Sequence, residues 1–182
     1  LDNPALTEEQ AAELFKIEKT LSHAVRLNKT LLLLTKIDNH QFPESTDVNM
    51  VELIEECVEN YGEVYSSRSV DFSCNLPDNY TLHINPSLAA TMVNNLVKNA
   101  YVHSQEGAVA AVTLQGDELV VSNTGDAALD ADHIFDRFYQ GQRKSGSTGL
   151  GLALVAAVCR YYNMGITYRF EGGRHNFCVK LK

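Results

Sequence analysis

The N-terminal part of the chain repeats apolar side chains at alternating steps of three and four residues. This spacing is typical of a heptad seam, and it favours a coiled-coil or bundle helix over a helix packed on its own domain. Thr7–Gln10 has the sequence of a capping box, so we expect one long helix over residues 7–40. The seam positions are Leu14, Ile17, Leu21, Ala24, Asn28 and Leu31, widened by Leu27 and Leu34.

Residues 39–46 interrupt this pattern, and Pro43 predicts a linker because proline cannot continue a helix. Helical periodicity returns between Met50 and Val64, and then over residues 86–104 and 149–162. Alternation of apolar and polar residues predicts strands at 70–74, 81–84, 108–114, 118–122, 166–170 and 176–181.

Helices and antiparallel strands in blocks predict an α+β fold, in the form of a two-layer α/β sandwich. Its helices would lie on a mixed, largely antiparallel sheet, preceded by one long bundle helix.

Composition narrows the functional classes. The chain has 182 residues and a net charge of −8, which makes a nucleic-acid partner a poor expectation. No apolar run reaches the about 18 residues of a membrane span, and no signal peptide is visible. The four cysteines form no CxxC pair, so reduced core thiols are the default. Because the chain begins at what resembles the start of a helix, we expect it to be part of a longer protein.

Two asparagines enter the apolar face of the helix predicted at 86–104. Asn95 and Asn99 are four residues apart, which places them within about 40° of each other on the helix. A buried amide is costly unless it is hydrogen-bonded. One candidate partner for these amides is a nucleotide with its metal. The other is neighbouring backbone, and the asparagine pair taken alone favours this second possibility.

A glycine-rich segment, GSTGLGL at residues 146–152, leads into the helix predicted at 149–162. Backbone N–H groups at a helix N-terminus can bind an anion such as phosphate, and Ser147 and Thr148 can cap the helix. The segment lacks the GxxxxGK[ST] pattern of a Walker loop, and no long parallel βαβ pattern surrounds it. Glycines that permit tight contact between helix and sheet remain the alternative.

Two further segments carry weaker signals. Asn123, Thr124 and Gly125 end a predicted strand, and a side-chain amide there can face a purine edge or simply form a turn. The sequence IFDRFY at 134–139 and the residues after it combine aromatic and basic side chains. In an acidic protein such a basic cluster supports an anionic ligand, although an ordinary solvated loop with an aromatic anchor fits too. Its members are Phe135, Arg137, Phe138, Arg143 and Lys144.

In this order, NxxxNA, NTG, IFDRFY and GSTGLGL closely resemble the catalytic ATP-binding domain of bacterial two-component sensor histidine kinases. That family shares a superfamily with gyrase, mismatch-repair and heat-shock chaperone ATPases. The resemblance covers about residues 47–182. The preceding helix resembles the second helix of the family's dimerisation and phosphotransfer domain. The implied division is residues 1–41 for that partial domain and 42–182 for the catalytic domain.

The resemblance implies ATP and Mg²⁺ as ligands and assigns roles by motif. Asn99 would hold Mg²⁺ through its side-chain oxygen, Asn95 would face the phosphates, and Asn123 and Gly125 would lie at the adenine. The other implied contacts come from the lid aromatics Phe135 and Phe138, the cations Arg137, Arg143 and Lys144, the glycine segment Thr148, Gly149, Leu150 and Gly151, and His103 near the nucleotide.

The chain also departs from the family pattern. Asn123 stands where aspartate is usual, Asp126 and Ala127 replace the second glycine of that motif, and Val102 replaces a common basic residue. We expect weaker discrimination between bases, and the departures keep open a degenerate nucleotide-binding module with a regulatory role.

Asn95 bears on the reaction, since hydrolytic members of the superfamily carry glutamate there as general base and an amide cannot take up that proton. The implied reaction is transfer of the ATP γ-phosphoryl to a histidine, for relay to an aspartate of a response-regulator receiver domain. A serine/threonine kinase of the same superfamily is disfavoured by Asn95 and by the bundle helix.

No histidine of the chain lies in the family's phosphoacceptor motif, H-E-L-R-x-P; His23, for example, is followed by Ala-Val-Arg. The acceptor would therefore lie outside this chain, and no catalytic residue is expected within it. The resemblance further implies a homodimer through the helical bundle and a cytoplasmic domain of a membrane-anchored receptor. Direct membrane contact and nucleic-acid binding by this part are not expected.

Overall fold

The computed structural model describes residues 6–141 and 148–182. Its helices are α1 (Glu8–Asp38), α2 (Met50–Val64), α3 (Pro86–His103) and α4 (Gly151–Tyr161), with a short 3-10 helix η1 (Ser66–Arg68). Its strands are β1 (Thr46–Asn49), β2 (Asp71–Asn75), β3 (Thr81–Ile84), β4 (Val109–Gln115), β5 (Glu118–Thr124), β6 (Gly165–Glu171) and β7 (Arg174–Lys180).

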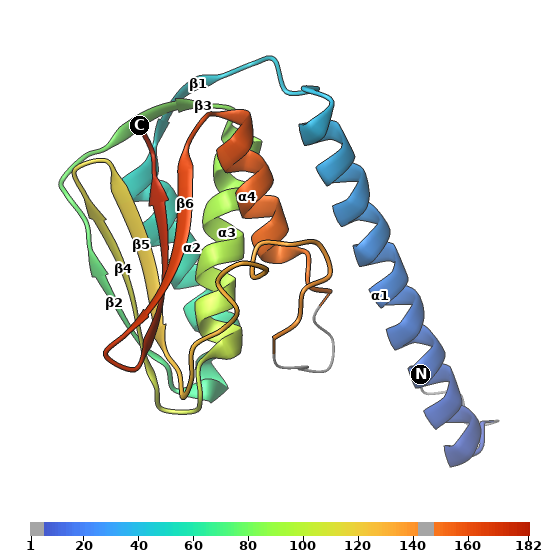
Figure 1. The fold of residues 1–182 in the computed structure, drawn as a ribbon. Coiled ribbons are helices and arrows are strands. Elements are labelled where there is room, and N and C mark those ends of the chain that lie inside the picture. The colour runs from blue at the N-terminus through green and yellow to red at the C-terminus, as the bar shows by residue number, and fades with distance from the viewer. Residues whose placement is uncertain (1–5, 142–147) are drawn as a thin grey trace.

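The long helix α1 starts as its sequence predicts. The Thr7 hydroxyl accepts from the Gln10 backbone N–H, and the Gln10 side chain accepts from the Thr7 backbone N–H, which completes the capping box. At the other end, Leu34 and Ile37 are buried, and this end of the helix packs beside α4. Farther from α4 the helix projects beyond the rest of the molecule (Figure 1).

The predicted heptad seam of α1 lies largely open in this single chain. Ile17 and Leu21 are 61% and 64% exposed, and Leu14 is 39% exposed. An apolar stripe of this length gains stability only when another surface covers it. The role of α1 as one helix of a dimerisation bundle therefore stays a prediction.

The main sheet has five strands in the order β2-β4-β5-β7-β6. Only the β2–β4 pair is parallel, and the other neighbours are antiparallel. A separate two-stranded sheet pairs β1 with β3. Its strand β1 was not predicted, because residues 46–49 alternate weakly and gain their extended form by pairing with β3.

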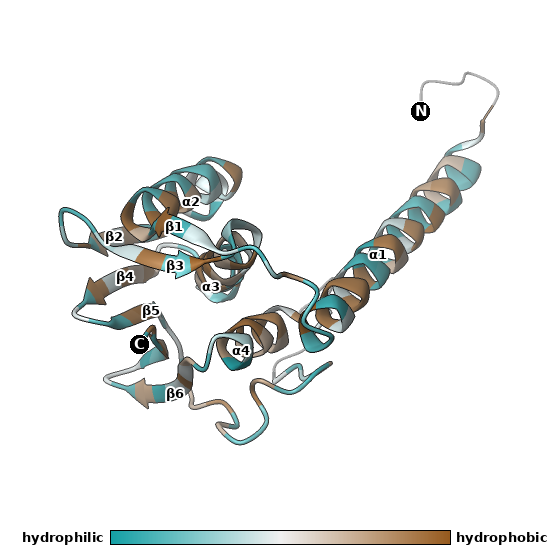
Figure 2. Cartoon of the chain, turned by 90° about the horizontal axis from the view of Figure 1, so that it is seen from above, coloured by the Kyte–Doolittle hydropathy of each residue, from teal (hydrophilic) through white to brown (hydrophobic). Residues whose placement is uncertain are grey.

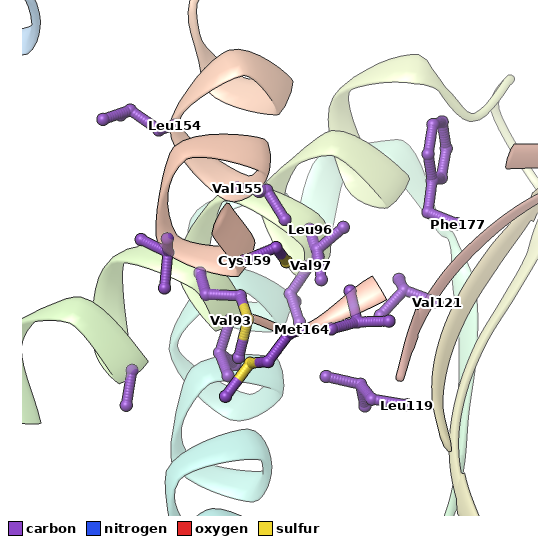
Figure 3. Close-up of a cluster of buried hydrophobic side chains, with 14 of the residues drawn as sticks. Val93, Leu96, Val97, Leu119, Val121, Leu154, Val155, Cys159, Met164 and Phe177 are labelled. Carbon is purple, nitrogen blue, oxygen red and sulfur yellow. The ribbon is translucent and has the colours of Figure 1, made fainter. Parts of the chain in front are cut away.

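Helices α2, α3 and α4 cover one face of the five-stranded sheet, and α1 stands outside α4 (Figure 2). Figure 3 shows the core between these layers, with Leu96 and Val155 on the helix side and Val121 and Phe177 on the sheet side. All four side chains are at most 2% exposed. The predicted two-layer α+β fold with a mixed, largely antiparallel sheet is confirmed.

Several boundaries differ from the sequence prediction by one or two residues, and two of these differences matter for the site. Helix α4 begins at Gly151 rather than at Gly149, because Gly149 has φ +66°, which is not helical. Strand β7 begins at Arg174 rather than at 176, because it follows its neighbour β5 as far as Thr124. Within the described ranges, no helix has both the length and the apolar character to cross a membrane.

Candidate nucleotide-binding site

The two asparagines singled out in the sequence lie on α3, one turn apart and half-buried. Asn95 Nδ2 donates to the Thr91 carbonyl at 2.7 Å, so local backbone satisfies the donor half of this amide. The acceptor half faces the start of α4, because a Cβ added to Gly151 would lie 3.0 Å from Asn95 Oδ1. Helices α3 and α4 thus bring Asn95 and Gly151 together, and a glycine at 151 permits the approach.

Asn99 differs from Asn95 in its contacts. Its amide forms no hydrogen bond to another residue within 6–141 or 148–182. His103 follows one turn later on α3 and is also half-buried. A half-buried amide oxygen of this kind is a suitable ligand for a hard cation such as Mg²⁺.

The N-terminus of α4 has the backbone geometry of an anion site. Leu150 is the N-cap residue and is fully buried, and no side chain among residues 6–141 and 148–182 caps the helix. The prediction that Thr148 caps the helix is therefore wrong, while Ser147 lies outside the described residues. The first N–H groups of a helix have no intrahelical acceptor, and here they combine with the helix dipole to favour an anion.

Gly149 joins this N-terminus to the preceding loop. The Phe138 backbone N–H donates to the Gly149 carbonyl at 2.9 Å. A Cβ at Gly149 would lie only 2.7 Å from backbone atoms of Phe138 and Tyr139, and its φ of +66° also favours glycine. The glycine is thus required by close backbone contact with this loop, which differs from the helix–sheet contact expected as the alternative, and it holds the loop next to α4.

The aromatic residues before this contact do not share one role. Ile134 is 3% exposed and Phe135 packs against the core, so both anchor the segment. Phe138 is 56% exposed, and the prediction that it anchors the lid is wrong. Its φ of +66°, together with the bond to Gly149, turns the side chain outward.

The basic residues of this loop are only partly described. Arg137 Nη2 donates to Asp38 Oδ2 at 2.5 Å, so it contacts the end of α1. Contact between Arg137 and phosphate stays a prediction, and it requires this ion pair to open. Arg143 and Lys144 lie outside the described residues.

The strand end at Asn123 forms a separate part of the site. Asn123 is 1% exposed on β5, and its Nδ2 donates to the Thr124 carbonyl at 3.0 Å. The register pairs Asn123 with His175 of β7. The next glycine, Gly125, donates its N–H to the Gly173 carbonyl at 3.0 Å. A buried amide therefore lies at the end of a central strand, beside a glycine.

His175 is the residue of this region that sequence reasoning missed. Its Nε2 would lie 1.9 Å from a Cβ on Gly125, so the imidazole edge occupies the room that a side chain there would need. Burial lowers the pKa of His175, partly offset by the charge of Asp126, which favours the neutral ring. The sequence prediction started this strand at 176 and considered the histidine only as a phosphoacceptor. The signal that could have found it is its place in strand register opposite Asn123.

The described residues contain no group of three or more His, Cys, Asp and Glu side chains that could hold a metal ion. Mg²⁺ commonly keeps water and substrate oxygens as ligands, so one protein oxygen can be enough for a Mg²⁺ that binds together with phosphate. Asn99 is the candidate for that oxygen. The four cysteines are free, and burial raises the pKa of Cys57 and of Cys159 to about 12, so both stay thiols.

Comparison with known proteins decides the family. Residues 84–182, which contain α3, the strand end at Asn123 and α4, match the family described as histidine kinase-, DNA gyrase B-, and HSP90-like ATPases. The chain belongs to this ATPase family. The expected superfamily is thereby confirmed.

The relatives that this ATPase domain matches include sensor histidine kinases. It is 30% identical over 175 residues to the heme sensor protein HssS of Staphylococcus epidermidis, covering 93% of this chain and 38% of HssS. It is 31% identical over 179 residues to the probable sensor histidine kinase TcrY of Mycobacterium tuberculosis, covering 91% of this chain and 37% of TcrY. The chain thus spans less than two fifths of the length of either relative.

Among solved structures, the Acinetobacter baumannii histidine kinase AdeS superposes on this ATPase domain and α1 with a TM-score of 0.71. The identity is 19%, and the match covers 97% of this chain and 85% of that one. At this identity the likeness shows the fold alone. It includes nearly all of the chain, and it supports the expected α+β architecture.

Proposed function

We propose that this chain is the ATP-binding catalytic part of a sensor histidine kinase, which holds Mg-ATP so that the γ-phosphoryl reaches a histidine outside the chain. The observation that carries the proposal is the approach of Asn95 Oδ1 to Gly151 at the N-terminus of α4, which no described side chain caps. An amide on one helix thereby borders an anion-binding helix end on the next, with Asn99 one turn away.

The site divides the work of binding among its residues. The N–H groups at the start of α4 would bind phosphate oxygens, and the Asn99 oxygen would complete the coordination of Mg²⁺. Asn123 and Gly125 would form the base subsite, where the buried amide oxygen can accept from an exocyclic amino group. Bound Mg²⁺ would supply charge neutralisation at the phosphates, which together with positioning is most of what phosphoryl transfer requires.

The chemistry of residue 95 favours transfer over hydrolysis. An amide cannot remove a proton from water, and Asn95 Nδ2 is already engaged by the Thr91 carbonyl. A positioned acceptor would therefore compete well with solvent. In the parent protein we propose a histidine of a partner domain as acceptor, relay to a response-regulator aspartate, and a homodimer formed through α1. The parent would be a membrane-anchored receptor with this part on its cytoplasmic side.

Calorimetric titration is the direct test of nucleotide binding. We expect Mg-ATP to bind at one site, metal-free ATP to bind more weakly, and Mg-GTP to bind more weakly than Mg-ATP. Transfer is tested by adding a separate acceptor domain and [γ-³²P]ATP, with acid-labile, base-stable phosphate expected on the acceptor and none on this chain. Absence of Mg-ATP binding at millimolar concentration would refute the proposal.

A degenerate nucleotide-binding module with a regulatory role is the second candidate. Two observations favour it: an amide rather than a carboxylate at position 123, and an Arg137 that is engaged by Asp38. It predicts metal-dependent ATP binding without transfer to any supplied acceptor domain. The transfer assay therefore separates the two candidates, whereas titration alone does not.

A further inference from the structure

A chain of hydrogen bonds runs from the loop after β5 to the imidazole of His175. The Leu129 backbone N–H donates to the Tyr168 hydroxyl oxygen at 2.9 Å, and that oxygen lies 2.8 Å from His175 Nδ1. The hydroxyl oxygen has a second lone pair and could also accept from Nδ1–H, but its own proton would then have no acceptor among the described residues. Donation from the hydroxyl to Nδ1 is the arrangement that uses every donor. The proton of the neutral ring therefore lies on Nε2.

The ring that carries this proton is held on several sides. It stacks on Tyr168 with centroids 5.9 Å apart and meets Phe170 at 5.1 Å. Its Nε2 edge is the part nearest Gly125, and the residue opposite in register is Asn123. Nδ1 is occupied by Tyr168, so Nε2 is the polar atom that His175 offers to a ligand bound at Asn123 and Gly125.

We infer that His175 selects the purine at this site, and that Tyr168 is the positioning residue that sets its tautomer. The inference rests on the proposed nucleotide site and adds base recognition to it. Adenine presents an amino donor beside a ring-nitrogen acceptor, which matches the acceptor oxygen of Asn123 and the Nε2–H donor of His175. Guanine presents an oxygen acceptor beside an N–H donor, the reverse pattern, so both contacts become unfavourable.

This role explains how an amide at position 123 can serve in base recognition. A carboxylate can only accept, whereas the amide of Asn123 offers both an acceptor and a donor and would tolerate either purine if it could turn. Donation from Nδ2 to the Thr124 carbonyl holds one orientation, and the Tyr168-directed tautomer of His175 adds a second restriction. Two weak preferences thereby act in the same direction.

The decisive variant is Tyr168→Phe, which keeps the ring packed against Phe177 at a centroid distance of 5.4 Å but removes the hydroxyl. Titration with Mg-ATP and Mg-GTP should show that the ATP/GTP affinity ratio falls about fivefold, the usual size of one hydrogen bond. The matched control is Tyr139→Phe. Its hydroxyl accepts from the Asp130 backbone N–H at 3.3 Å in the same loop, but makes no contact with His175. The control should keep the wild-type ratio.

Nitrogen-15 chemical shifts of the histidine ring report the tautomer directly. In the wild type at pH 7.5, His175 should show a protonated Nε2 and an unprotonated Nδ1, and Tyr168→Phe should shift toward a mixture. His175→Ala should lower the ATP/GTP ratio as far as Tyr168→Phe does or further, and the double variant should lower it no more than His175→Ala alone.

The outcomes separate the inference from the function on which it rests. Tyr168→Phe could instead lower the affinity for both nucleotides by the same factor. That result would mean that the Tyr168–His175 pair only holds the loop at Leu129, and it would overturn the inference. A ring proton on Nδ1 in the wild type would overturn it as well. If the wild-type chain binds neither Mg-ATP nor Mg-GTP, the nucleotide site itself fails.

Discussion

The two ends of the candidate site are built in different ways. At the base end, Asn123 and His175 lie on neighbouring strands of the sheet, and both side chains are held by hydrogen bonds. At the phosphate end, the Asn99 side-chain amide has no hydrogen-bond partner among the described residues, and Arg137 is paired with Asp38. The proposed base end is thus held by internal hydrogen bonds, whereas at the proposed phosphate end Arg137 would have to leave Asp38 to reach a phosphate.

The difference assigns separate tasks to the two ends. Preorganised groups add selectivity because they lose little entropy on binding and cannot adapt to a wrong ligand. Groups that exchange partners couple ligand binding to other parts of the molecule, because the ligand then breaks an ion pair that held two segments together. Base recognition should therefore change only its immediate surroundings, while phosphate binding should break the contact between Arg137 and Asp38 at the end of α1.

The largest expected effect lies at the phosphate end. Asn99→Ala should abolish the Mg²⁺-dependent part of ATP affinity, because it removes the proposed protein oxygen on the metal. Calorimetric titration with and without Mg²⁺ measures it, and circular dichroism should show an intact fold. Asn94→Ala is the control, because Asn94 is also half-buried on α3 and donates to the Ala90 carbonyl at 2.7 Å. Equal loss in both variants would contradict the assignment.

At the base end, Gly125→Ala should destabilise the protein by about 1–3 kcal/mol, the usual cost of forcing extra atoms into a packed site. The added Cβ would lie 1.9 Å from His175 Nε2, so the imidazole must move. Urea unfolding measures the change, and ATP affinity should fall with it. Gly165→Ala is the control, since its Cβ would meet Lys180 Cβ at an ordinary 3.5 Å. Unchanged stability of Gly125→Ala would mean that the His175 ring can move away from residue 125 without cost.

The pH dependence of stability is a smaller test of the same end. The lowered pKa of His175 means that the unfolded state binds the proton more readily, so the neutral ring contributes stability above its ordinary pKa of 6.5. That contribution is lost as pH falls from there through the lowered pKa of the folded state. Tyr168 and Asp126 are the other titratable groups that face the ring. Urea midpoints should fall less between pH 7.5 and pH 5 in His175→Gln than in the wild type; identical falls would contradict a buried neutral ring.

The smallest expected effect concerns the contact with α1. Asp38→Asn should raise Mg-ATP affinity about two- to fivefold, because it frees Arg137 from an exposed ion pair of modest strength. Asp136→Asn also removes one negative charge, from the residue next to Arg137 in sequence, but it breaks the pair of Asp136 with His133 instead, so it controls for net charge. Equal affinities in the two variants would show that Arg137 does not exchange Asp38 for phosphate.

Much of the fold follows from local sequence patterns. The capping box at Thr7, the alternation at Thr81–Ile84 and the helix from Pro86 each gave an element close to its observed bounds. These signals are local, since they depend on caps and on burial of one face. The order of strands in the sheet and the parallel β2–β4 pair depend on long-range pairing, which local patterns do not specify.

The site shows the same division. Asn95 and Gly151 could be singled out from motif order, but their mutual contact depends on how α3 packs on α4. His175 and the Asp38–Arg137 pair were missed because each joins residues far apart in the chain. The exposed Phe138 was misjudged because a left-handed backbone conformation at a non-glycine residue has no reliable sequence signal.

The position of β7 has a consequence for synthesis. This strand is the last of the sheet along the chain, yet it lies between β5 and β6 and carries His175. While a ribosome still covers residues 174–180, β5 has an unpaired edge and the base subsite lacks one wall. ATP bound at the proposed base subsite would therefore assist folding only after translation has passed this strand.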